Sequence, residues 1–314
     1  FLFVAVFLFS QVDFYSIIYG RKSTKLQMQL TEDISMKHSH KAILVVSFGT
    51  SYEDARKATI ERIENDITAA FPEYRIYRAW TSRMILSILK KRDQITIPNV
   101  REAMEQMIDD GITEVVVQPT HILDGIENHA MKDEILSYKE QFRSISFGTP
   151  LLSGQKDAET VVHAIAKRFE ELDDNTALVL MGHGTTHQVN HVYEELDQLF
   201  KDMGYPNIFL GTVEAKPSVQ ELIHQIGNYR IPASDSDCEE DCTSVDKVVL
   251  APFMIVAGDH AHNDMAGSHP ESWLSRFQEA GYETESVLKG LGAYEKVRKL
   301  FIEHVQTAIN DMSV

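Results

Sequence analysis

The stretch Ala177-Leu-Val-Leu-Met-Gly-His-Gly-Thr-Thr186 decides the fold, because a short apolar run leads directly into a glycine-rich turn. Such a run, closed by glycine, is typical of a buried strand in a parallel sheet. Residues 187–203 then carry apolar side chains at helical spacing. His183 is therefore predicted at the carboxyl end of a strand, where open α/β sheets bind ligands. The alternative is that His183 is a turn residue bonded to a nearby carbonyl.

The same arrangement occurs earlier in the chain. Residues 42–51 align with residues 177–186 at an offset of 135, and residues 114–119 align with residues 247–252 at an offset of 133. Two nearly equal offsets over this distance indicate a duplicated domain. Each half also alternates strand-like and helix-like segments, which predicts a parallel sheet covered on both faces.

The predicted fold is α/β, with two similar doubly wound domains and a cleft between them. We expect the domains to cover residues 36–165 and 166–314. Equivalent loops of the two domains would face the cleft, which is a preferred place for a ligand. In the alignment of the two halves, Glu127 falls on His260.

Composition excludes several classes of protein. The formal net charge is −17, with 47 acidic against 30 basic residues, so a nucleic-acid partner is not expected. The chain has no phosphate-binding Gly-x-Gly-x-x-Gly, no Walker loop and no Gly-x-Ser-x-Gly. Nucleotide enzymes and ordinary α/β-hydrolases are therefore not expected, and no nucleotide cofactor is predicted.

The first residues differ from the rest of the chain. Residues 1–9 form a continuous apolar run that is too short to span a bilayer and has no positively charged start. We interpret residues 1–35 as a leader or a misassigned upstream extension, with Met36 as the working start and a cytoplasmic location. If residues 1–35 are instead a truncated export signal, the protein is exported or periplasmic. Membrane association is not expected.

An acidic segment interrupts the second half between residues 231 and 247. It carries six acidic residues and few apolar ones, so we interpret it as a solvated surface insert. Its two cysteines, Cys238 and Cys242, are the only ones in the chain, so a disulfide framework is not expected. We expect any metal binding by this pair to be adventitious.

Another dense group of polar residues follows the apolar run that ends at Pro252. Asp259, His260, His262 and Asp264 lie within six residues of one another. Polar residues at this density are unusual in a plain connector, so we interpret the segment as functional. The alternative is an aspartate that caps a helix, with exposed histidines beside it.

Glu214 emerges at the same predicted edge as His183, in the segment Gly211-Thr-Val-Glu-Ala-Lys-Pro217, where Pro217 is expected to begin a helix. Alone, such a glutamate is more often a capping residue. Together with His183 and His260 it would supply two imidazoles and a carboxylate at three neighbouring strand ends. Such a set binds borderline divalent metals, namely Co²⁺, Ni²⁺, Fe²⁺ or Zn²⁺, and imidazoles also move protons near neutral pH.

Several other histidines are interpreted as structural or solvated. His187 and His191 have the i, i+4 spacing of a helical metal pair, but position 188 is not glutamate, so the metalloprotease motif is absent. His38 and His40 precede the first expected strand, and His163, His224 and His304 lie within expected helices. For the first half, the pattern predicts one helix over residues 53–70, a loop over 124–129 and a helix over 131–142.

Four motifs resemble those of a known family, the anaerobic sirohydrochlorin cobaltochelatases of cobalamin synthesis. The similarity extends from about Lys41 to the C-terminus. The motifs are Ser47-Phe-Gly-Thr-Ser51, Met181-Gly-His-Gly184, Gly211-Thr-Val-Glu214 and Val256-Ala-Gly-Asp-His-Ala-His-Asn-Asp-Met-Ala266. This family is similar in fold to protoporphyrin ferrochelatase, so the resemblance implies two doubly wound domains around a tetrapyrrole cleft.

The resemblance implies an enzyme that inserts Co²⁺, its substrate metal, into sirohydrochlorin. His183, Glu214 and His260 would hold the metal, and His183 and His260 would also accept the pyrrole protons. Glu127 matches a further family glutamate more loosely and would relay protons or contact the ring. If imidazoles are the bases, activity should fall below about pH 6.

The tetrapyrrole carries eight carboxylates in this family, so local cations are needed. Arg78, Arg83 and Lys216 lie near strand ends and are the candidates for substrate binding. The alternative functions are Fe²⁺ or Ni²⁺ insertion into the same ring, as for sirohaem, or a non-catalytic protein that binds metal or haem. The sequence is compatible with a homo-oligomer but does not specify one.

Overall fold

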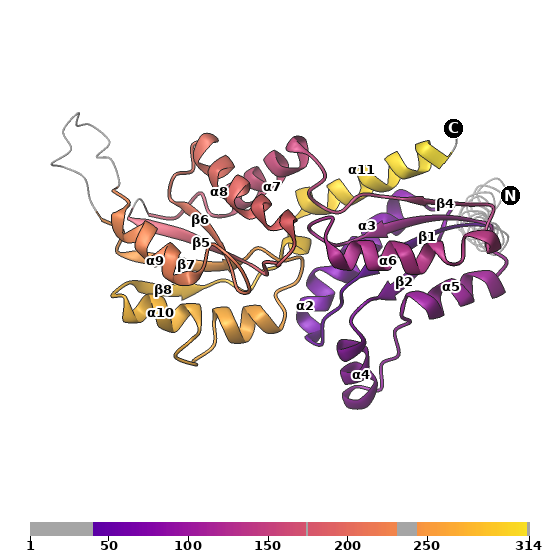
Figure 1. Cartoon of the computed structure of the whole chain (residues 1–314), viewed down its shortest axis with the longest axis horizontal. Coiled ribbons are helices and arrows are strands. Elements are labelled where there is room, and N and C mark those ends of the chain that lie inside the picture. Colours follow the sequence, from indigo (N-terminus) through magenta and orange to yellow (C-terminus); the bar gives the residue numbers. More distant parts are fainter. Residues whose placement is uncertain (1–39, 174, 231–243, 313–314) are drawn as a thin grey trace, which may run out of the picture.

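The computed structural model describes residues 40–173, 175–230 and 244–312. The extension over residues 1–35 and the cysteine pair of the acidic insert lie outside these ranges. Within them, the chain forms two four-stranded sheets with helices on both faces, so the α/β fold class predicted from the sequence is confirmed (Figure 1).

Both sheets are wholly parallel and have the same topology. Their strand orders are β2-β1-β3-β4 and β6-β5-β7-β8. The first sheet consists of β1 (Lys41–Ser47), β2 (Arg75–Trp80), β3 (Glu114–Pro119) and β4 (Ser144–Phe147). The second consists of β5 (Thr176–Gly182), β6 (Ile208–Thr212), β7 (Lys247–Pro252) and β8 (Glu283–Ser286).

The register of the central strands repeats with the offsets found in the sequence. Val46 pairs with Pro119 in the first sheet, and Met181 pairs with Pro252 in the second. The two sheets therefore place equivalent residues at equivalent strand ends. In each sheet the topology switches direction between its two central strands, which is where ligands of open α/β sheets bind.

The helices form a covering layer on each face of the sheets. In the first half they are α2 (Glu53–Ala58), α3 (Ile60–Ala70), α4 (Arg83–Arg92), α5 (Val100–Asp109), α6 (Ile126–Leu136) and the short η1 (Lys139–Gln141). In the second half they are α7 (Gln155–Arg168), η2 (Gln188–Asn190), α8 (His191–Asp202), α9 (Val219–Asn228), the π-helical turn η4 (Ala261–Met265), α10 (Trp273–Glu279), η5 (Leu291–Ala293) and α11 (Glu295–Met312).

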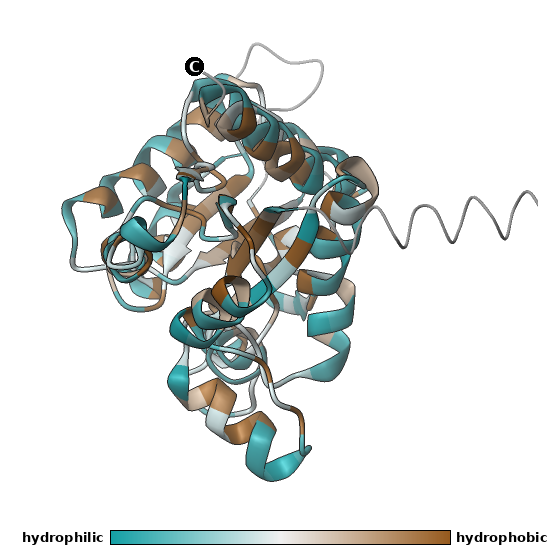
Figure 2. Cartoon of the chain, turned by 90° about the vertical axis from the view of Figure 1, so that its right-hand side faces the viewer, coloured by the Kyte–Doolittle hydropathy of each residue, from teal (hydrophilic) through white to brown (hydrophobic). Residues whose placement is uncertain are grey.

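Alternate residues of the strands enter different cores. In β1, Ala42, Leu44 and Val46 pack with residues of α5 and α6, whereas Ile43 and Val45 join a core that also contains residues of the second sheet. One hydrophobic core is therefore shared by both halves, and burial of strands on both faces explains their continuous apolar sequence. Figure 2 shows the same distribution, with hydrophilic residues on the outward faces of the helices.

Helix α11 belongs to the second half in sequence but crosses to the first sheet. It contacts α3, β3 and β4 as well as α7, and Figure 1 shows it running across the top of the first half. At its start, the Arg298 Nε donates to Asp66 Oδ2 of α3 at 2.6 Å. The helix therefore joins the halves, while a division of the chain at residues 165 and 166 stays a prediction.

Two helices differ from the sequence prediction in the first half. The single helix expected over residues 53–70 is broken at Thr59, whose φ of −128° and ψ of −80° are not helical. The loop expected over residues 124–129 is wrong in its second part, because α6 begins at Ile126 and ends at Leu136. Gly125 is its N-cap residue and offers no capping side chain, so the usual start signal is missing.

Two boundaries in the second half also differ. Residues 187–190 are not part of α8, which begins at His191, so His187 and His191 are not one turn apart on a common helix. Pro217 does not begin a helix, because Ser218 is the N-cap residue of α9 and accepts a hydrogen bond from the Glu221 N–H. Among the described residues, no helix combines the length and apolar character needed to cross a membrane.

Candidate metal centre

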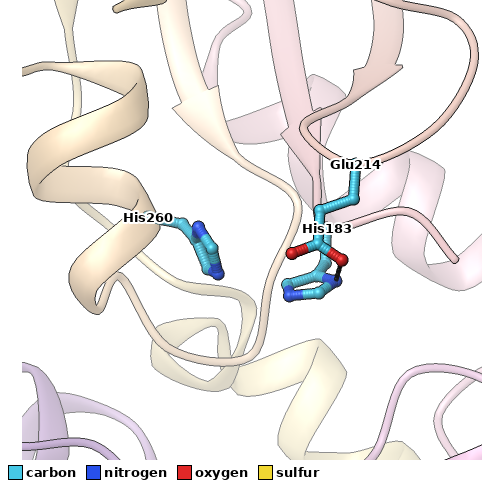
Figure 3. A group of neighbouring side chains, drawn as sticks. All are labelled: His183, Glu214 and His260. Carbon is cyan, nitrogen blue, oxygen red and sulfur yellow. Dashed lines mark ion pairs between the residues drawn. The ribbon is translucent and has the colours of Figure 1, made fainter.

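Three side chains predicted to bind metal lie together at the carboxyl edge of the second sheet. One potential ligand atom each from His183, Glu214 and His260 lies within 4.8 Å of the other two (Figure 3). They follow β5, β6 and β7, which are neighbours in the strand order β6-β5-β7. The parallel sheet thus brings residues from three separate segments to one point.

Two glycines place His183. A Cβ on Gly182 would lie 2.4 Å from the ring of Tyr193, and Gly184 has a φ of +84°, which side chains rarely tolerate. The strand can therefore end against α8 and turn sharply, with His183 at the turn. The ring Nδ1 lies 2.9 Å from the Gly184 carbonyl oxygen, which can only accept, so Nδ1 carries the proton and Nε2 keeps its lone pair.

Backbone pairing beyond the strands places Glu214. The Glu214 N–H donates to the His183 carbonyl at 2.9 Å, and the Val213 N–H donates to the Gly182 carbonyl at 3.0 Å. The carboxylate Oε2 then lies 3.7 Å from Nδ1 of His183. The Glu214 side chain remains half-exposed, which keeps the carboxylate available to an ion.

His260 is oriented by an aspartate on the following turn. Its Nδ1 lies 2.6 Å from Asp264 Oδ2 across the π-helical turn η4. An ionised carboxylate only accepts hydrogen bonds, so Nδ1 donates and Nε2 is the free ring nitrogen. Such a carboxylate partner fixes the tautomer and the orientation of a metal-binding ring. The rings of His260 and His183 meet edge to face, with centroids 4.7 Å apart.

The other two residues of this polar segment do not join the metal centre. Asp259 Oδ1 accepts from the Tyr52 hydroxyl at 3.2 Å and from Asn263 Nδ2 at 2.9 Å. The His262 ring stacks on the Tyr52 ring with centroids 4.3 Å apart, and its Nδ1 lies 2.9 Å from the Gly258 carbonyl oxygen. Tyr52 comes from the first half, and sequence reasoning missed it because no local pattern marks a contact between distant segments.

Glu127 lies on the first half, in the first turn of α6. The pKa of Glu127 is raised above the ordinary glutamate value, mainly by desolvation. His183 lowers this pKa to a smaller extent, and Glu214 raises it further. The carboxyl is therefore close enough to feel both metal-centre residues, while part of its surface stays open to solvent. Nearby, the rings of His129 and His187 meet edge to face at 6.3 Å, so the start of α6 contacts the second half.

The basic residues predicted to bind substrate have different surroundings. Arg78 Nε donates to Glu64 Oε1 at 2.7 Å, and Glu64 is buried, so this guanidinium is already paired. Lys216 Nζ lies 2.9 Å from Glu221 Oε1. Arg83 is exposed at the start of α4. Among the described residues, Arg83 therefore has fewer hydrogen bonds and ion pairs with protein groups than Arg78 or Lys216 has.

The structural interpretation of the remaining histidines fits their contacts. His304 is buried, with Nδ1 3.1 Å from the Thr149 carbonyl oxygen and Nε2 3.2 Å from Asp157 Oδ2. His187 Nδ1 accepts from the Val189 N–H at 3.2 Å and so caps η2. In the described part of the chain, only His183, Glu214 and His260 form a group of three potential ligands within 4.8 Å of one another.

This donor set has a definite chemical preference. Two neutral imidazoles and a carboxylate suit borderline divalent ions such as Co²⁺, Ni²⁺, Fe²⁺ and Zn²⁺ better than the hard ions Mg²⁺ and Ca²⁺. A neutral imidazole is also a proton acceptor. The arrangement can therefore hold a divalent ion and take up protons at the same place.

Comparisons with known proteins identify relatives of this chain. The family described as cobalt chelatase (CbiK) matches residues 41–310. A sirohydrochlorin cobaltochelatase from Salmonella typhimurium is 36% identical over 270 residues, covering 86% of this chain and 97% of that protein. The sirohydrochlorin cobaltochelatase CbiKC of Nitratidesulfovibrio vulgaris is 27% identical over 277 residues, covering 86% of this chain and 91% of that protein.

A solved structure supports the fold. SirB from Bacillus subtilis with Fe³⁺ superposes with a TM-score of 0.58 at 15% identity, covering 87% of this chain and 97% of that chain. The resemblance inferred from the sequence motifs is confirmed by the family match over most of the chain. The chain therefore belongs to the cobalt chelatase (CbiK) family and is a metal chelatase.

Proposed function

We propose that the protein inserts Co²⁺ into sirohydrochlorin and that His183, Glu214 and His260 bind the ion before transfer. The observation that carries the proposal is the convergence of these three side chains within 4.8 Å, at the carboxyl edge of a parallel sheet. The sirohydrochlorin cobaltochelatase of Salmonella typhimurium, 36% identical, supports both the ring and the metal.

The reaction exchanges one divalent ion for two protons. Co²⁺ sheds its protein and water ligands, two pyrrole N–H groups each lose a proton, and four ring nitrogens take over the metal. Because acceptor-only partners hold Nδ1 of His183 and of His260, each ring offers Nε2 either to the ion or to a proton. As the ion leaves for the ring, these two nitrogens become free to accept the two protons.

Glu127 is proposed to carry protons away from the metal centre. Its raised pKa makes the carboxyl a better proton acceptor than an ordinary glutamate. It lies on the first half, so it faces the histidines from the other side of the contact between the halves. Arg83 is proposed to bind substrate carboxylates. It is exposed and begins α4, which follows the carboxyl end of β2 in the first sheet.

The test is anaerobic absorbance of sirohydrochlorin mixed with the protein and Co²⁺, with no nucleotide added. We expect the spectrum to change to that of the cobalt complex faster than without protein. Parallel reactions with Fe²⁺ and Ni²⁺ rank the metals. No acceleration with Co²⁺, or the same acceleration with His183→Ala as with wild type, would rule out the proposed site.

A further inference from the structure

Tyr52, from the first half, touches the segment that carries His260. Its ring stacks on His262, with centroids 4.3 Å apart and planes at 17°, and its hydroxyl donates to Asp259 Oδ1 at 3.2 Å. Asp259 and His262 lie on either side of His260 in the chain. One side chain therefore contacts the segment on both sides of a proposed metal ligand.

Two hydrogen bonds hold the backbone of Tyr52 in place. Its N–H donates to Thr50 Oγ1 at 3.2 Å, and its carbonyl accepts from the Arg56 N–H at 2.9 Å, as the N-cap residue of α2. Tyr52 is partly buried. The ring is thus attached to a helix start of the first half and not to a free loop tip.

The segment that Tyr52 contacts has further internal bonds. Asn263 Nδ2 donates to Asp259 Oδ1 at 2.9 Å, and His262 Nδ1 lies 2.9 Å from the Gly258 carbonyl oxygen. These bonds connect Asp259 and His262 to neighbouring residues of the segment that carries His260. His260 has its own partner, Asp264, which orients the ring but lies on the same turn and cannot anchor the turn to the rest of the protein.

We infer that Tyr52 is a positioning residue for His260, which anchors the metal-binding turn of the second half to the first half. The inference rests on the proposed function in that His260 is taken as a ligand of the transferred Co²⁺. It follows that the Co²⁺ affinity depends on the contact between the halves, so a change in their separation would alter how the ion is held.

Variants of Tyr52 separate its two contacts. Tyr52→Phe keeps the stacking on His262 and removes the hydrogen bond to Asp259, whereas Tyr52→Ala removes both. Since one hydrogen bond contributes about 1 kcal/mol, we expect Tyr52→Phe to weaken Co²⁺ binding about fivefold. Loss of residues that orient metal ligands costs about 10- to 100-fold, and we expect Tyr52→Ala to fall in that range.

The matched control is Tyr77→Phe. The Tyr77 hydroxyl donates to Asp110 Oδ2 at 2.6 Å on the first sheet, so this variant removes the same kind of tyrosine–aspartate bond far from the metal centre in the chain. We expect Tyr77→Phe to lower the melting temperature while Co²⁺ affinity stays within about twofold of wild type. A double variant, Tyr52→Phe with Asp259→Ala, should bind Co²⁺ no more weakly than Asp259→Ala alone, since Asp259→Ala already removes the hydrogen bond that Tyr52→Phe removes.

The measurement is titration of each full-length protein with Co²⁺ alone, followed by the visible ligand-field absorption of the bound ion, and then by insertion kinetics. Wild-type affinity and an unchanged Co²⁺ spectrum in Tyr52→Ala would overturn the inference, as would equal weakening in Tyr77→Phe. If wild-type protein binds Co²⁺ but inserts none into sirohydrochlorin, the proposed function is wrong, while the Co²⁺ titration still decides the role of Tyr52.

Discussion

His183 and His260 hold their imidazole rings edge to face, with centroids 4.7 Å apart and planes at 85°, although they follow different strands. Each ring has its Nδ1 against an acceptor, the Gly184 carbonyl in one case and Asp264 in the other. Both Nε2 atoms are therefore left for outside partners. The pair can offer two nitrogens to one ion, with Glu214 as the proposed third ligand.

Replacing either histidine should abolish most of the metal transfer without unfolding the protein. We expect His183→Ala or His260→Ala to slow Co²⁺ insertion by at least about 100-fold, because even residues that only orient ligands cost 10- to 100-fold. Both side chains are partly exposed, so the free energy of unfolding should change by no more than about 0.5 kcal/mol. Anaerobic absorbance and thermal unfolding measure the two effects.

His224→Ala is the control for that experiment. His224 lies on α9 beside Asn228 and is not part of the metal centre. Its replacement should leave insertion unchanged. A similar loss of insertion in His224→Ala would mean that the assay reports a general effect of histidine removal, and not the loss of a ligand.

Asp264 should matter through the tautomer of His260. Asp264→Ala frees the ring, and we expect metal affinity to fall by about 10- to 100-fold. Asp264→Asn is a sharper test, because the amide can donate to Nδ1 and so move the ring proton to Nε2, where the ion must bind. We therefore expect Asp264→Asn to bind Co²⁺ at least as weakly as Asp264→Ala. Wild-type affinity in the asparagine variant would contradict this role.

The metal centre could be predicted from the sequence because its signals are local. Gly182 and Gly184 mark a strand end with a turn, and the alternation of strands and helices indicates that the strands of each half lie in one parallel sheet. Once three strand ends are placed along one sheet edge, their polar residues must converge. The resemblance to the family then gave the same three residues.

Contacts between distant segments could not be predicted in this way. Helix α2 ends at Ala58, and the Oγ1 of its C-cap residue Thr59 donates to the Ala55 carbonyl at 2.6 Å. Gly292 packs so closely here that a Cβ on it would lie 2.9 Å from Thr59 Cβ. The periodicity of residues 53–70 carries no sign of this approach from the end of the chain. Tyr52 was missed for the same reason, since its partners lie in the other half.

The free energy of unfolding should depend on pH through Glu127. Burial raises the pKa of Glu127 above the ordinary glutamate value of 4.5, so the folded protein binds this proton more tightly than the unfolded chain. The free energy of unfolding therefore falls as pH rises from 4.5 through the raised pKa. Glu127→Gln lacks the charge, so it should melt at a higher temperature than wild type near neutral pH, with the difference disappearing in acid.

Glu127→Gln should slow turnover, although it should raise the melting temperature near neutral pH. If Glu127 removes protons, Glu127→Gln slows insertion at neutral pH and loses the acid limb that this carboxyl gives the wild-type pH profile. Thermal unfolding and insertion rates across a pH series measure both effects. A variant that inserts Co²⁺ at the wild-type rate with an unchanged profile would remove Glu127 from proton transfer.

Glu221→Gln is the control for the thermal unfolding experiment, because the pKa of Glu221 is lowered where that of Glu127 is raised. The backbone hydrogen bond from Ser218, and then Lys216, lower the pKa of Glu221 to about 2. This group stabilises the folded state above the ordinary value of 4.5, and that contribution is lost as pH falls towards about 2. Glu221→Gln should therefore lower the melting temperature at neutral pH, where Glu127→Gln raises it. Shifts of the same sign in both variants would contradict the assignment.

Helix α11 should be needed for the stability of both halves, because it crosses from the second to the first. Phe301 on this helix is fully buried in the core that both sheets share. Truncation of such a phenylalanine costs about 3–5 kcal/mol, so Phe301→Ala should lower the free energy of unfolding by that amount. Leu136→Ala, at an exposed position of α6, should change it by no more than about 0.5 kcal/mol.

Because Phe301 is not part of the metal centre, Phe301→Ala should still bind Co²⁺ well below its melting temperature. Denaturant unfolding followed by tryptophan fluorescence measures the difference, since Trp80 is buried in the first half and Trp273 in the second. Loss of structure at one tryptophan only would show that α11 does not join the two halves into one cooperative unit.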